Sequence, residues 1–222
     1  MIKKYEITNE TIRSKNGTGK GIVLHRIRAL NHFGDVTKGD FGGWIQDEYN
    51  LSHEGTCWVA DEAIVCKNAK VFDDAIVYGN AKVFDDAMVY GNARVFEGAR
   101  VYGNARVFDD ARVYGNAKVY QYVRIYGKAQ IYDNAKIFGG PTIFDFARVF
   151  NEARVFGIAR ICGKARISGY AQVFDYTKVL ENAVVCDEAK ISGNAIVSGN
   201  AVVSGKKEVF GDEKIYGNDE NL

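Results

Sequence analysis

Every sixth residue from position 59 to position 203 is Val or Ile, and the register never slips. The repeating unit is x-Ala-(Lys/Arg)-(Val/Ile)-(Phe/Tyr)-(Gly/Asp), as in residues 80–85, Asn-Ala-Lys-Val-Phe-Asp. A short fixed period over most of a chain is typical of a repeat architecture, in which each copy buries the apolar face of its neighbour. The sequence therefore predicts a rod of stacked coils rather than a globule around one central core.

The alternation within each unit predicts strands and indicates which side chains point inward. Ala and Val/Ile are two residues apart, whereas Lys/Arg and Phe/Tyr occupy the opposite phase, and a period of two is the signature of a strand. If Lys/Arg and Phe/Tyr pointed inward, nearly every unit would bury a Lys or Arg. The free energy of desolvating those charges exceeds what stacking of the strands could return. We therefore expect Ala and Val/Ile to fill the core, with the aromatic side chains outside.

A four-residue strand followed by a two-residue corner makes one side of a polygon, and such small core residues fill only a triangle. Three units then form a coil of about 18 residues, and about eight to nine coils at the usual strand spacing give a rod of roughly 40 Å. The early corners alternate Asp-Asp with Gly-Asn at a period of twelve residues. Twelve does not divide eighteen, so acidic corners are two coils apart, which relieves repulsion between them. The predicted fold is an all-β, single-stranded parallel β-helix.

We divide the chain into an N-terminal β cap at residues 1–56, repeats at 57–205, and degenerate final repeats with an acidic tail at 206–222. In the last part Lys207 and Glu213 replace the inward Ala, so the coil is expected to fray there.

Charge and composition exclude several classes of protein. Lys+Arg 29 against Asp+Glu 28 leaves a net charge of +1, which argues against a nucleic-acid binder. No apolar run approaches about 18 residues and no signal peptide is visible, so we expect a soluble, cytoplasmic protein without membrane contact. Cys57 falls in the inward Ala column, while Cys66, Cys162 and Cys186 fall outward on three different faces, so no disulfide among them is expected.

Two resemblances follow from particular motifs. Residues 77–82 (Val-Tyr-Gly-Asn-Ala-Lys) and 101–106 (Val-Tyr-Gly-Asn-Ala-Arg) resemble the hexapeptide repeat of left-handed parallel β-helices, which implies the left hand. Residues 26–30 (Arg-Ile-Arg-Ala-Leu), 42–45 (Gly-Gly-Trp-Ile) and 57–59 (Cys-Trp-Val) resemble the start of YdcK-like proteins. Those are bacterial and phage hexapeptide-repeat proteins, often named as transferases by analogy of fold. The resemblance implies a bacterial cell or a phage-infected host and brings no established activity.

Hexapeptide acyltransferases are the enzyme class that this resemblance suggests. They work as trimers and use a His on a coil beside loops that leave the helix. Here His25, His32 and His53 all precede the coils, and the frame never accommodates an inserted loop. Acyl transfer would lack a general base and a lid that excludes water. We therefore predict no catalytic residue, no cofactor and no metal site, and more readily a non-enzyme than an enzyme.

One face carries the candidate site. Eighteen outward positions are Phe or Tyr, and stacked rings by themselves stabilise a ladder. At one corner, however, Tyr and Ile stand where other coils have Asn or Asp, which is poor turn chemistry without a packing partner. Stacking every eighteenth residue gives a ring column of Tyr120, Phe138, Phe156 and Phe174, a corner of Tyr122, Gly140, Ile158 and Tyr176, and a further column of Lys118, Lys136, Arg154 and Gln172.

We therefore predict a non-catalytic scaffold or interaction module that presents aromatic and basic faces. The expected partner is a second copy, with a homotrimer favoured, or another protein. Two alternatives remain: an acyltransferase-like enzyme whose site lies between subunits or in the cap, and a phage-type inhibitor that occludes a host protein. Nucleic acid is an unlikely ligand by geometry, since coils about 4.8 Å apart do not match bases stacked about 3.4 Å apart.

Overall fold

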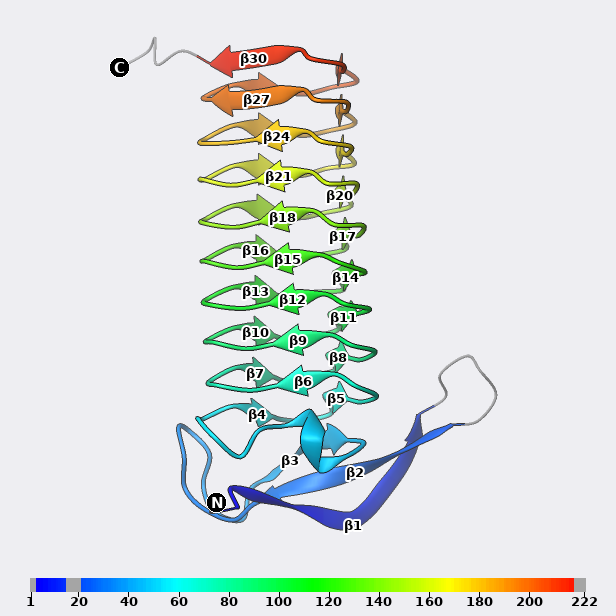
Figure 1. Cartoon of the computed structure of the whole chain (residues 1–222), viewed down its shortest axis with the longest axis vertical. Helices are drawn as coiled ribbons and strands as arrows, with labels where there is room; N and C mark the ends of the chain where they lie inside the picture. Colours follow the sequence, from blue (N-terminus) through cyan, green and yellow to red (C-terminus); the bar gives the residue numbers. More distant parts are fainter. Residues whose placement is uncertain (1–2, 15–20, 218–222) are drawn as a thin grey trace.

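The computed structural model describes residues 3–14 and 21–217, which form a three-sided parallel β-solenoid standing on a small β cap (Figure 1). Each sheet is one face of the rod. The first face consists of β5 (Ile64–Val65), β8 (Lys82–Val83), β11 (Arg100–Tyr102), β14 (Lys118–Tyr120), β17 (Lys136–Ile137), β20 (Arg154–Val155), β23 (Gln172–Val173), β26 (Lys190–Ile191) and β29 (Glu208–Val209).

The second and third faces each contain nine strands. The second face consists of β6 (Lys70–Val71), β9 (Met88–Val89), β12 (Arg106–Val107), β15 (Arg124–Ile125), β18 (Thr142–Ile143), β21 (Arg160–Ile161), β24 (Lys178–Val179), β27 (Ile196–Gly199) and β30 (Lys214–Gly217). The third face consists of β4 (Trp58–Val59), β7 (Ile76–Val77), β10 (Arg94–Val95), β13 (Arg112–Val113), β16 (Gln130–Ile131), β19 (Arg148–Val149), β22 (Arg166–Ile167), β25 (Val184–Val185) and β28 (Val202–Val203).

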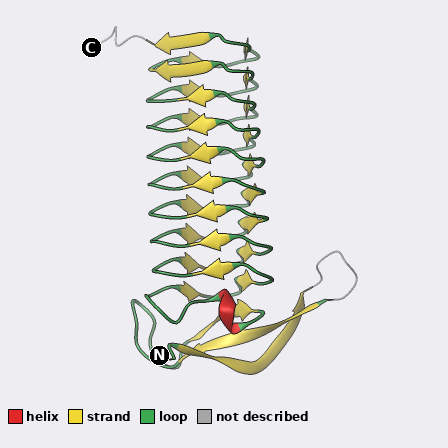
Figure 2. Ribbon diagram, in the orientation of Figure 1, coloured by secondary structure: helices red, strands yellow, loops and turns green. Residues whose placement is uncertain are grey.

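The register confirms three units per coil. Arg100 pairs with Lys118 and Val101 with Val119, eighteen residues further along the chain. In Figure 1 the rising chain crosses the near side leftward through β6 and the far side rightward through β7, which is a left-handed path. Most strands contain two residues rather than the four predicted. Figure 2 shows them as short arrows joined by turns, and the chain turns at corner residues such as Asp85 (φ 60°).

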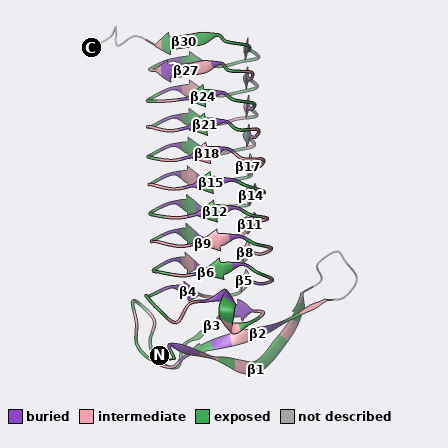
Figure 3. Cartoon of the chain, viewed as in Figure 1, coloured by how far each residue is buried: buried purple, intermediate pink, exposed green. Residues whose placement is uncertain are grey.

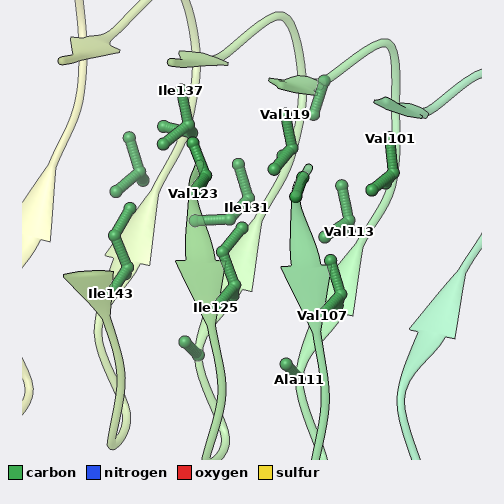
Figure 4. Packing of buried hydrophobic residues seen from close by; sticks show 14 of the residues in the cluster. Val101, Val107, Ala111, Val113, Val119, Val123, Ile125, Ile131, Ile137 and Ile143 are labelled. Atoms are coloured by element: carbon green, nitrogen blue, oxygen red, sulfur yellow. The ribbon is translucent and has the colours of Figure 1, made fainter. Parts of the chain in front are cut away.

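The predicted core is confirmed. Ala and Val/Ile point inward and are buried along the whole rod, so that each coil packs on the inward side chains of the next (Figures 3 and 4). Val101, Val119 and Ile137 follow one another up the first face with no exposed surface. Burying an aliphatic side chain of this size stabilises a fold by about 1.5–3 kcal/mol, and the repeat applies that gain in every unit.

The corners show a second use of the twelve-residue alternation. Asp73 and Gly91 lie at one corner in successive coils, and the Gly91 N–H donates to Asp73 Oδ2 at 3.1 Å. Asp109 accepts from the Gly127 N–H in the same way, at 3.2 Å. A Cβ at Gly91 would lie 2.8 Å from the backbone nitrogen of Asp109, so a side chain at this position would force the backbone to shift. The alternation therefore satisfies corner amides as well as separating the acidic residues.

The cap consists of β1 (Tyr5–Ser14), β2 (Ile22–Ala29), β3 (Phe41–Ile45) and the short 3₁₀ helix η1 (Glu48–Asn50). β3 pairs antiparallel with β2 and parallel with β5, so it joins the cap to the first face. Cys66, predicted to face outward, is buried, because Leu24 of β2 and Trp44 of β3 pack over it.

The C-terminal end of the described chain does not fray, contrary to the prediction. β30 pairs with β27 over four residues, and the Lys190 N–H donates to the carbonyl of Lys207 at 2.9 Å. Lys207 and Glu213 occupy inward positions yet are exposed, because no described coil covers them. The acidic tail at 219–222 lies outside the described residues. Within the described ranges, η1 is too short to span a membrane and no other segment forms a membrane-spanning helix.

Candidate functional site

The ring column predicted on the first face is present. The ring centroids of Tyr120 and Phe138 are 5.2 Å apart, those of Phe138 and Phe156 are 5.0 Å apart, and those of Phe156 and Phe174 are 4.7 Å apart. The rings are nearly parallel and only partly exposed, because rings of the neighbouring coils cover both faces of Tyr120, Phe138 and Phe156 and one face of Phe174.

The same stacking occurs on the other faces. A column on the second face runs from Phe72 to Phe144, and one on the third face runs from Tyr78 to Phe150, with centroids 4.8–5.0 Å apart. Stacked rings contribute about 0.5–1.5 kcal/mol per pair beyond the area they bury. The ring columns thus stabilise all three faces, and they do not mark the first face as a site.

The corner between the first and second faces does differ from the other corners. Its residues Tyr122, Gly140, Ile158 and Tyr176, which we call the apolar edge, lie in successive coils joined by backbone hydrogen bonds of 2.7–2.9 Å. The side chains of Tyr122, Ile158 and Tyr176 are 70%, 59% and 62% exposed. Unlike the stacked rings, they leave most of their surface in contact with solvent.

Above and below the apolar edge, the same corner carries a polar ladder. Asn68 Nδ2 donates to Asp86 Oδ1 at 2.9 Å, and Asn194 Nδ2 donates to Asp212 Oδ1 at 3.0 Å. The fold is therefore satisfied by polar side chains at these positions. Exposed Tyr and Ile give up those hydrogen bonds without gaining a buried contact, which is typical of a surface that another molecule covers.

Gly140 leaves a gap in the apolar edge. Its neighbour Gly139 has φ +85°, and a Cβ there would lie 2.9 Å from the carbonyl oxygen of Gly157, so the backbone needs Gly at 139. At Gly140 φ is not in the left-handed region, and a Cβ would meet nothing closer than 3.8 Å. The fold therefore does not require the gap between Tyr122 and Ile158, which we call the notch.

The predicted basic column lies where expected. Lys118, Lys136, Arg154 and Gln172 pair in register on β14, β17, β20 and β23. The twelve residues of the candidate site therefore line one continuous strip, from this column across the ring column to the apolar edge.

The histidines do not form a site. The His53 ring stacks on Tyr5 at 4.3 Å, its Nδ1 accepts from the backbone N–H of Lys4 at 3.2 Å, and its Nε2 lies 2.8 Å from Glu48 Oε1. Both ring nitrogens are thus engaged in holding the cap together. His25 lies on β2 opposite Ile45.

His32 is exposed, in the chain that follows β2. Among the described residues, no three His, Cys, Asp or Glu side chains gather as metal ligands.

The contact between Lys4 and Cys57 was not predicted from the sequence. Lys4 is buried, and its Nζ donates to the carbonyl oxygen of Cys57 at 2.9 Å and to Cys57 Sγ at 3.2 Å. Burial nevertheless raises the pKa of the Cys57 thiol, and it also raises the pKa of Cys162 and of Cys186. A thiol with a raised pKa is a poor nucleophile at neutral pH.

The third face carries a groove of about 500 Å³ beside Trp58, Arg94 and Arg112. It contains neither His nor Cys. Its Asp74 accepts hydrogen bonds from the backbone N–H and the hydroxyl of Thr56 at 2.9 and 2.8 Å, which lower the pKa of that carboxyl. A carboxylate held in this way is a weak base, so Asp74 is poorly suited to act as a general base.

Comparison with known proteins agrees with the fold. Residues 99–113 and 189–205 match the YdcK β-solenoid repeat. A protein of Escherichia coli strain K12 named uncharacterized acetyltransferase YdcK is 38% identical over 64 residues, which are 28% of this chain and 20% of that protein. The chain thus aligns with about a fifth of the curated relative's length. The resemblance to YdcK-like β-solenoid proteins predicted from the sequence is confirmed.

Proposed function

We propose that this protein is a non-catalytic β-solenoid that binds another protein chain through the apolar edge and the adjoining strip of the first face. One observation carries the proposal: Tyr122, Ile158 and Tyr176 interrupt a polar ladder that the fold satisfies above and below them. The chain that covers the edge is either a second copy, with the trimer as the preferred assembly, or a different protein.

The chemistry of the described residues supports this proposal over catalysis. His53 is engaged at both nitrogens, and the coils hold no His. The pKa values of the Cys57, Cys162 and Cys186 thiols are raised. Acyl transfer directly from donor to acceptor needs a general base that deprotonates the acceptor, and transfer through an acyl-enzyme needs a side-chain nucleophile as well.

The test replaces the exposed residues of the apolar edge by Asn, which other coils have at this corner. The triple variant Tyr122→Asn/Ile158→Asn/Tyr176→Asn should fold as the wild type does, because Asn occupies this corner in other coils. Phe146→Asn is the matched control, since Phe146 is a 54% exposed residue at a different corner. The absolute mass of the wild type, the triple variant and the control is measured by light scattering at a concentration of order 10 µM. Self-association through the edge is shown if the wild type and Phe146→Asn are multimers and the triple variant is a monomer.

If the wild type is a monomer, a photo-crosslinking amino acid at position 158, with position 146 as control, reports contact with a different protein inside the cell. Adducts from 158 and not from 146 support the proposal. A monomer that yields no adduct from 158 contradicts it.

The name of the Escherichia coli relative keeps acetyl transfer as a second candidate. Replacing His25, His32 and His53 together separates the two functions. An enzyme that uses any of these histidines loses turnover of an acetyl donor, whereas a binding module keeps its adducts from position 158.

A further inference from the structure

Two columns of basic side chains run beside the apolar edge, one on each face that meets there. The first-face column contains Lys118, Lys136 and Arg154, and the second-face column contains Arg124, Arg160 and Lys178. None of the six takes part in an ion pair with another described residue. Arg160 lies 5.0 Å from the centre of the Phe144 ring, on the side of the second face that is remote from the apolar edge.

Carboxylates are missing along most of the apolar edge, and the exception is Asp175, next to Tyr176 at the C-terminal end of the edge. Between Asp86 and Asp175, the residues of this corner and of its two flanking columns include no Asp or Glu. The other two corners are acidic at the same height. One carries Glu97, Asp133 and Glu152, and the other carries Asp109, Asp110 and Asp145. Positive charge therefore flanks the exposed side chains of the apolar edge, whereas the exposed Phe146 and Tyr170 lie at the two acidic corners.

This charge distribution distinguishes the two candidate partners. Two copies that met edge to edge would oppose two sets of six positive charges, and like charges across an interface suppress association. An edge whose apolar side chains lie between basic columns instead complements a segment whose apolar side chains lie between acidic ones.

The spacing of the edge favours a polypeptide over a nucleic acid. The coils place successive side chains 4.7–5.2 Å apart, as the ring columns show, whereas bases stack about 3.4 Å apart. The exposed side chain at the centre of the edge is Ile158, which offers no ring on which a base could stack.

We infer that the apolar edge binds an acidic polypeptide segment of another protein, with an apolar side chain of that segment in the notch at Gly140 and Asp or Glu residues on either side. The inference rests on the proposed function and adds the chemistry of the partner. The notch suits an apolar anchor, because Gly140 has no side chain and the corner residues one coil to either side of it are the exposed Tyr122 and Ile158.

The experiment selects random peptides of about 12 residues on the wild-type protein after removing those that bind the triple Asn variant. The selected peptides should carry Phe, Leu or Ile flanked by Asp or Glu. Their affinity should fall at least about tenfold in Lys136→Glu/Arg160→Glu, and it should fall further as NaCl rises from about 50 to about 500 mM.

A second variant fills the notch with a side chain. Gly140→Tyr should fold normally, because positions 122 and 176 of the same corner already hold Tyr, and it should weaken peptide binding at least about tenfold. Lys164→Tyr, at the corner between the second and third faces, places the same side chain outside the edge and should leave binding unchanged.

The outcomes separate the inference from the proposed function. If the selected peptides bind through the apolar edge but lack Asp and Glu, the inference about an acidic partner is wrong and the proposed function still holds. Tighter binding of an oligothymidine at the edge, or a wild-type multimer that the triple variant makes monomeric, also overturns the inference. If no selected peptide depends on the edge and position 158 yields no adduct, both fail.

Discussion

Replacing Thr177 by Val is expected to stabilise the rod, because Thr177 brings a hydroxyl into a core otherwise made of aliphatic side chains. Thr177 occupies an inward position that is Ala in most units, it has no exposed surface, and its Oγ1 has no hydrogen-bond partner. Its carbonyl still accepts from the Arg160 N–H at 2.9 Å, so the backbone pairing there is regular. The unsatisfied group is the side chain alone.

The magnitude follows from the cost of burying an unpaired hydroxyl, which is about 1–3 kcal/mol. Val keeps the shape of Thr, so Thr177→Val should recover about 2 kcal/mol without leaving a cavity. For a chain of this size, that raises Tm by about 4–8 °C. Thr177→Ala also removes the hydroxyl but leaves a methyl-sized void that costs about 1 kcal/mol, so its stability should lie between those of wild type and Thr177→Val.

The assay is urea and thermal unfolding followed by far-UV circular dichroism, with hydrogen exchange of the coils around position 177 as a local measure. Thr142→Val is the control, because Thr142 points outward and is partly exposed, and its change should stay within about 0.5 kcal/mol. A Thr177→Val variant that is no more stable than wild type would refute the reasoning, since the hydroxyl would then have a partner in solution.

Three further predictions concern stability. Gly157→Ala should destabilise by about 2 kcal/mol more than Gly205→Ala in urea unfolding, because both have positive φ but only at Gly157 would a Cβ lie 2.5 Å from the backbone of the next coil. Phe108→Ala should cost about 1–3 kcal/mol of unfolding free energy, since its ring stacks on two others at 4.9 Å. Phe210→Ala, whose 62% exposed ring stacks on none, should change Tm little. Hydrogen bonds from Lys3 and then from the His53 ring lower the pKa of Glu48, so its stabilisation of the cap is complete above its ordinary pKa and is lost as pH falls through its lower folded value. Glu48→Gln should therefore flatten the acid-induced loss of cap protection in hydrogen exchange between about pH 6 and pH 3.

Much of the candidate site could be predicted because the site obeys the repeat. Once the coil holds eighteen residues, the positions of Tyr122, Ile158 and Tyr176 on one corner follow by counting, and the register of β14, β17 and β20 confirms it. Their exposure and the notch at Gly140 could not be obtained by counting, because they depend on how far each corner side chain projects from its neighbours.

The role of the ring columns could not be predicted from the sequence. The sequence shows that Phe and Tyr face outward, but an outward ring can be either a docking surface or a rung of a ladder. The near-parallel rings, 4.7–5.2 Å apart, show that stacking accounts for the rings of these columns on all three faces. The apolar edge consequently carries more of the functional argument than the ring column beside it.

The sequence by itself determined the alternation of inward and outward residues, the three sides and the register, because a strict period repeats the same local physical choice in every coil. Only the tertiary structure decided the contacts between segments that do not share that period. Leu24 and Trp44 cover Cys66, and the His53 ring is locked between Lys4 and Glu48. Asp73 bonds an amide one coil away, a partner fixed by the exact height of the rungs. Periodicity specifies which residues stack, whereas burial and pairing depend on distances that only the packed chain sets.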